Sequence, residues 1–71
     1  MIYDMEALPL MEEWKAARLV ENTAVENLLS AMKGGVRENA ILLELTKRME
    51  DTHNAAMDIY DRLQAFRLDQ V

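Results

Sequence analysis

The Lys33-Gly34-Gly35 segment most constrains how this chain can fold, because long amphipathic patterns lie on both sides of it. Lysine suits the negative C-terminal end of a helix, and we expect Gly34 to take the left-handed conformation that closes one. A helix, a tight reversal at residues 34–35 and a second helix then account for the chain as a single domain of residues 1–71. The sequence predicts an all-α antiparallel hairpin of two helices, in a helix-turn-helix layout that is not DNA-binding.

The first helix is predicted over residues 9–33, after a leader of residues 1–8. Pro9 favours a helix start, because its φ suits the first turn and it lacks an amide hydrogen that would go unbonded there. Apolar residues then recur at alternating spacings of four and three, which places them on one packing seam. The seam consists of Leu10, Trp14, Ala17, Glu21, Ala24, Leu28 and Ala31.

The second helix is predicted over residues 36–68, with a seam that alternates in the same way. That seam consists of Leu42, Leu45, Met49, Thr52, Ala56, Ile59, Leu63 and Phe66. At about 1.5 Å per residue this helix would be about 50 Å long, against about 37 Å for the first. We therefore expect it to overhang unless the leader folds back along it. In the folded hairpin Glu21 is expected to lie opposite Arg48 and to form an ion pair with it.

A chain of 71 residues buries a small fraction of its surface and needs additional stabilisation. The absence of cysteine excludes disulfides, and a single histidine cannot make a zinc site by itself. We therefore expect the hairpin to be completed by a partner or by dimerisation, through apolar residues outside the seams. These include Leu19, and the predicted partner-binding residues are Leu29, Met32, Leu43, Met57 and Tyr60.

The charge balance argues against a nucleic-acid partner. Thirteen acidic and eight basic residues give a net charge of −5, whereas phosphate binding needs a basic face. No apolar run approaches the roughly 20 residues of a membrane span. The N-terminus carries Asp4 and Glu6 where a secretory signal would carry lysine or arginine. The sequence predicts a soluble, cytoplasmic protein.

One motif has a spacing used in metal sites. Glu50 and His53 match the Glu-x-x-His spacing of di-iron helical bundles, and Glu21 would be the natural third ligand. Both residues fall beside the second seam, however, and solvated or paired side chains explain them more simply. No catalytic Ser-His-Asp or Cys-His set can be assembled, and no phosphate-binding glycine loop is present. We expect no enzyme activity, no catalytic residue, no metal and no cofactor.

The Met32–Gly35 turn between two helices, the second ending near Ile59 and Tyr60, resembles the small E-type (YscE-like) co-chaperones of type III secretion needle subunits. The resemblance is one of length and layout and covers residues 9–66. It implies a cytoplasmic hairpin that partners a larger helical chaperone and keeps the needle subunit monomeric. Two alternatives stay open: a homodimeric four-helix bundle with a structural or regulatory role, and a di-iron bundle using Glu21, Glu50 and His53.

Overall fold

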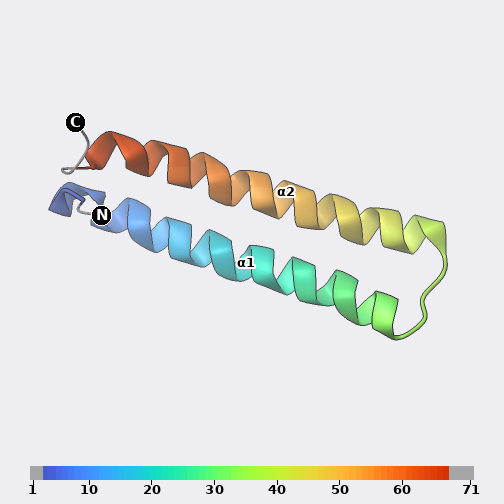
Figure 1. Cartoon of the computed structure of the whole chain (residues 1–71). Helices are drawn as coiled ribbons and strands as arrows, with labels where there is room; N and C mark the ends of the chain where they lie inside the picture. Colours follow the sequence, from blue (N-terminus) through green and yellow to red (C-terminus); the bar gives the residue numbers. More distant parts are fainter. Residues whose placement is uncertain (1–2, 68–71) are drawn as a thin grey trace.

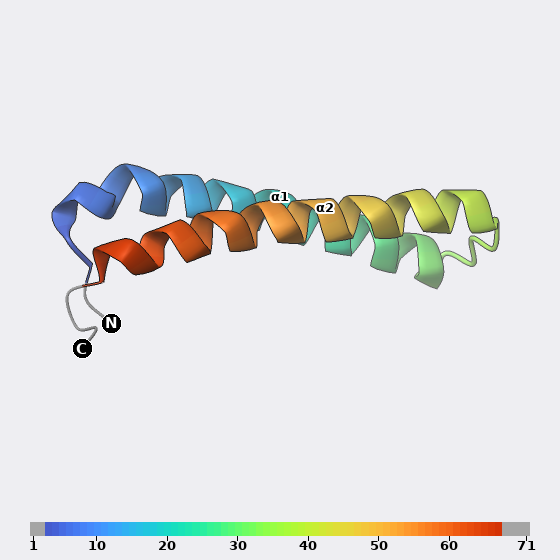
Figure 2. The same cartoon turned by 90° about the horizontal axis from the view of Figure 1, so that it is seen from above.

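The computed structural model describes residues 3–67. Two long helices, α1 (Leu8–Lys33) and α2 (Asn39–Leu63), lie side by side and antiparallel (Figure 1). The short 3-10 helices η1 (Met5–Ala7) and η2 (Gln64–Phe66) extend them at the end opposite the connection (Figure 2). The predicted hairpin is confirmed. Neither helix in residues 3–67 combines the length and apolar character that a membrane crossing requires.

The end of α1 is a Schellman motif. Gly35, not Gly34, is the left-handed residue: its φ is 82°, while Gly34 remains right-handed at −75°. The amide of Val36 donates to the carbonyl of Ala31 over 3.0 Å, and the amide of Gly35 donates to that of Met32 over 3.2 Å. These two bonds satisfy carbonyls that have no partner within the helix. They also fold Val36 back onto the last turn of α1, where it is half-buried.

The predicted range of 36–68 for the second helix is too long at both ends. Val36 is held by the Schellman motif and Glu38 is extended (φ −72°, ψ 116°), so α2 begins only at Asn39 and the connection spans residues 34–38. At the other end α2 stops at Leu63, a single 3-10 turn follows, and Arg67 is extended. Residue 68 lies outside the described residues. The two helices are therefore nearly equal in length, and α2 has no long overhang.

The described part of the leader closes the open end of the hairpin. Tyr3 and Arg67 form an antiparallel β-bridge, and the amide of Asp4 donates to the carbonyl of Phe66 over 2.8 Å. The Asp4 carboxylate caps η1 by accepting from the amide of Glu6 over 2.9 Å. Leu8, placed in the leader by the sequence pattern, already belongs to α1. Residues 1 and 2 lie outside the described residues.

The interior between the helices is thin. Every residue of the two predicted seams is buried or half-buried, which confirms the seams, but only Ala56 and Leu63 are fully buried apolar members. The chain exposes 5585 Å², whereas a compact monomer of 8.2 kDa exposes about 4500 Å². Its radius of gyration is 15.8 Å, against about 11 Å for a compact domain of this length. The hairpin is a rod with much of its apolar surface uncovered.

Candidate functional site

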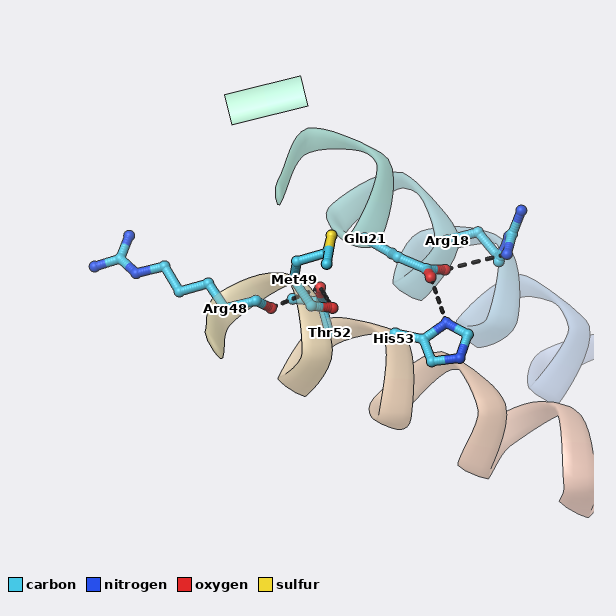
Figure 3. Close-up of polar contacts among 6 residues, drawn as sticks. All are labelled: Arg18, Glu21, Arg48, Met49, Thr52 and His53. Carbon is cyan, nitrogen blue, oxygen red and sulfur yellow. Dashed lines mark hydrogen bonds and ion pairs between the residues drawn. The ribbon is translucent and has the colours of Figure 1, made fainter. Parts of the chain in front are cut away.

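A polar cluster joins the two helices near their middle. Oε2 of Glu21 in α1 lies 2.6 Å from Nδ1 of His53 in α2, and Nη1 of Arg18 donates to Oε1 of Glu21 over 3.1 Å (Figure 3). The Glu21 side chain is only 10% exposed, while those of Arg18 and His53 are about half exposed. A carboxylate removed from water needs such partners, and each oxygen has one here.

The expected pairing of Glu21 with Arg48 is wrong. Arg48 instead donates to Glu44, one turn earlier on the same helix, over 3.1 Å. Its side chain points away from Glu21 (Figure 3). Five residues separate Arg48 from His53, a rotation of about 140° around the helix axis. That rotation brings His53, and not Arg48, onto the side of α2 where Glu21 lies.

The three candidate metal ligands are only partly brought together. Glu21 and His53 are in contact. Both line a shallow cavity of about 190 Å³, and Glu50 lines it too, together with Val25 and Met49. Within residues 3–67, no group of three or more acidic or histidine side chains is placed to hold a metal ion. The Glu21 carboxylate is already engaged by Arg18 and His53.

That cavity marks one broad side of the hairpin, which we call the Met face. Residues three, four or seven apart share a side of a helix, so the side can be followed from Val25 along α1 and from His53 along α2. Its large apolar members are Met11, Trp14, Val25, Leu29 and Met32 from α1 and Leu43, Met57 and Tyr60 from α2. All five predicted partner-binding residues therefore lie on this one side.

The exposure of the predicted residues is uneven. Leu29 is 47% exposed, Met32 60%, Leu43 71% and Met57 39%, so these four are accessible in the hairpin. Val25, 40% exposed, belongs with them and was missed. Its spacing of four before Leu29 and seven before Met32 was the signal that could have identified it. The surface is apolar along most of its length and is interrupted at its middle by the Arg18, Glu21 and His53 cluster.

The spacing pattern predicted that Tyr60 lies outside the contact between the two helices, but the structure places it within that contact. Its ring centroid is 5.8 Å from that of Trp14, with the planes tilted by 43°, and both residues are half-buried. A large ring beside the seam of α2 is long enough to contact a large ring in the seam of α1. A spacing pattern takes no account of the length of a side chain, so it could not predict this contact. The pair forms the aromatic end of the Met face.

The opposite side of the hairpin is also partly apolar. It carries an open groove of about 360 Å³ between the helices. The groove is lined by Val20, Thr23, Ala24, Asn27, Leu45, Arg48, Asp51 and Thr52, most of them polar or small. Val20 is its most exposed large apolar member. Sequence spacing had not singled out this groove.

No protein-family model matches this chain, and no curated protein and no solved structure matches it either.

Proposed function

We propose that this chain is a non-enzymatic protein-binding module whose Met face docks on a helical partner. One observation carries the proposal. Leu29, Met32, Leu43 and Met57 gather on one side of a hairpin whose described residues include only three fully buried apolar ones. Scattered exposed apolar residues are ordinary, but several large ones gathered on one side of so small a protein are typical of an interaction surface.

The composition of the Met face suits a helical partner. Thioether side chains adapt to apolar surfaces of varied shape, and three of the large residues on this face are methionine. At one end Trp14 and Tyr60 already pack against each other, so little side-chain freedom would be lost when a partner contacts them. An amphipathic helix laid along the rod would cover this strip.

The finer form of the proposal is a cytoplasmic co-chaperone of the YscE-like kind. The hairpin, its length and its Gly34-Gly35 turn agree with that layout. Such a protein would partner a larger helical chaperone that holds a type III secretion needle subunit. A subunit that polymerises through apolar helical surfaces must have them covered until export, and the Met face would support the chaperone that covers them.

The test is co-expression with the helical chaperone and needle subunit of a type III secretion system, followed by affinity purification of the hairpin. Met57→Glu should abolish recovery of the partners while the circular dichroism spectrum stays helical. Val20→Glu is the matched control, because Val20 is more exposed than Met57 but lies on the opposite side. It should leave recovery unchanged.

Two results would count against the proposal. If Val20→Glu and not Met57→Glu removed the partners, the docking surface would be the groove side and the Met-face assignment would be wrong. If the wild-type hairpin recovered neither protein, the co-chaperone role would be wrong.

A further inference from the structure

The methionines of the Met face make this surface open to chemical modification. The chain has six methionines and no cysteine, so reversible oxidation of its sulfur atoms can occur only at thioethers. We propose that oxidation of Met32 and Met57 to methionine sulfoxide by a peroxide switches off docking at the Met face while the hairpin stays folded. The inference rests on the proposed function, because it concerns the regulation of that same surface.

Burial divides the described methionines into two groups. Met32 and Met57 are 60% and 39% exposed, so both side chains are open to a small oxidant in solvent. Met11 and Met49 are half-buried, and Met49 belongs to the seam of α2. Met5 is 79% exposed, but it lies in η1 and is not a member of the Met face. Because oxidation follows exposure, the docking surface should be oxidised before the interior of the hairpin.

The two exposed methionines lie in opposite halves of the Met face. Met57 follows His53 by four residues, which places it about 6 Å toward the open end of the hairpin. Met32 follows Glu21 by eleven residues, which places it about 17 Å toward the connection. Glu21 and His53 are in contact and mark one level along the rod. The two methionines are therefore about 23 Å apart along it, and a helix that covers the strip must contact both.

The reaction is the transfer of one oxygen atom. The thioether sulfur attacks one oxygen of hydrogen peroxide, an S–O bond forms and the O–O bond breaks. The second oxygen leaves as water with both hydrogens. Sulfur loses two electrons and the peroxide gains them, so no further reactant is needed. The product is a polar side chain in place of an apolar one.

A sulfoxide at either position should oppose docking without unfolding the hairpin. In the free chain its oxygen is solvated, because Met32 and Met57 are open to water. Under a partner helix the same oxygen would be buried among apolar side chains without a hydrogen-bond donor, which is unfavourable. Two sulfoxides in separate halves of the strip impose this penalty twice. A methionine sulfoxide reductase would restore the thioethers and with them the apolar surface.

The experiment compares methionine with leucine, which has nearly the same volume and helix propensity but cannot be oxidised in this way. Each chain is treated with hydrogen peroxide at a dose where peptide mass spectrometry finds sulfoxide at Met32 and Met57 and none at Met49. Recovery of the helical chaperone by affinity purification is then measured. A second readout is the fluorescence of anilinonaphthalene sulfonate, a dye that reports exposed apolar surface.

We expect the oxidised wild-type chain to keep its helical circular dichroism spectrum, to lose dye fluorescence and to recover at least about tenfold less chaperone. The double variant Met32→Leu, Met57→Leu should bind chaperone and dye equally before and after treatment. Met5→Leu is the matched control, because it removes the most exposed of the described methionines from a position outside the Met face. It should respond to peroxide as the wild type does.

Four outcomes would overturn the inference. The untreated wild-type chain could bind no dye, or it could keep its dye fluorescence or its recovery of chaperone after both sulfoxides have formed. The double variant could lose as much binding as the wild type, or the oxidised chain could lose its helical spectrum.

The proposed function is decided separately, by the untreated chain. If that chain recovers no chaperone, the co-chaperone role is wrong. The dye measurement then still decides whether oxidation of Met32 and Met57 removes the apolar surface, because it requires no partner protein.

Discussion

The carboxylate of Glu21 in α1 lies 2.6 Å from Nδ1 of His53 in α2, a residue 32 positions later in the chain. It is the one polar residue in the seam of α1, and it is buried between side chains that are half exposed. Sliding α2 by one turn would leave this carboxylate without its partner from the other helix. The contact therefore selects the register of the hairpin, although desolvation of the carboxylate offsets much of its stabilising effect.

Replacing this carboxylate with an apolar side chain should stabilise the monomer. Glu21→Leu fills a seam position and removes a desolvated charge, so we expect the free energy of unfolding to rise by about 1 kcal/mol. His53→Ala should lower it by a similar amount, because Glu21 then stays buried with Arg18 as its remaining partner. Urea unfolding at a concentration where the chain is monomeric measures both. A lower free energy of unfolding in Glu21→Leu would contradict this prediction, and it would show that the cluster adds net stability besides selecting the register of the helices.

The aromatic contact between Trp14 and Tyr60 should be measurable as a coupling energy. A double-mutant cycle with Trp14→Leu and Tyr60→Leu isolates the pair from the area that each ring buries alone. We expect a coupling of about 1 kcal/mol in favour of the pair, typical of aromatic rings at this separation. Additive single effects would mean that the two rings are stabilised independently by other neighbours.

The two glycines of the turn should respond differently to alanine. Gly35 has a φ of 82°, so Gly35→Ala should destabilise the hairpin by about 1–2 kcal/mol although no atom lies within 4 Å of the added methyl group. Gly34 is right-handed, and its added methyl group meets the carbonyl oxygens of Ser30 at 3.2 Å and Ala31 at 3.7 Å. Gly34→Ala should therefore cost less, and thermal unfolding of the two variants gives the comparison. The reverse order would place the left-handed residue at Gly34.

The thin core should depend strongly on Leu63, which is 2% exposed and the largest fully buried side chain among the described residues. Leu63→Ala should cost about 2–4 kcal/mol through lost burial and the cavity left behind. Leu19→Ala removes the same atoms from a position that is 60% exposed, and it should change stability by less than about 0.5 kcal/mol. Denaturant unfolding of both chains tests the contrast, and equal losses would contradict the burial pattern.

Periodicity identified most of the architecture. The glycine break predicted the hairpin, Pro9 predicted the start of α1 to within one residue, and the 3-4 spacing identified seams whose members are all buried or half-buried. The same spacing places Leu29, Met32, Leu43 and Met57 on a single side. These results follow from helix geometry alone, because the spacing of residues determines which of them share a side of a helix.

What spacing cannot determine is how one helix is placed against the other. The axial position and rotation of α2 are decided by packing, and they made His53 rather than Arg48 the partner of Glu21 and brought Tyr60 onto Trp14. The start of α2 was likewise decided by hydrogen bonds from Gly35 and Val36 back to α1. The sequence alone determined two helices and the side that each buries. Only the tertiary structure decided their register, because register depends on contacts between residues far apart in the chain.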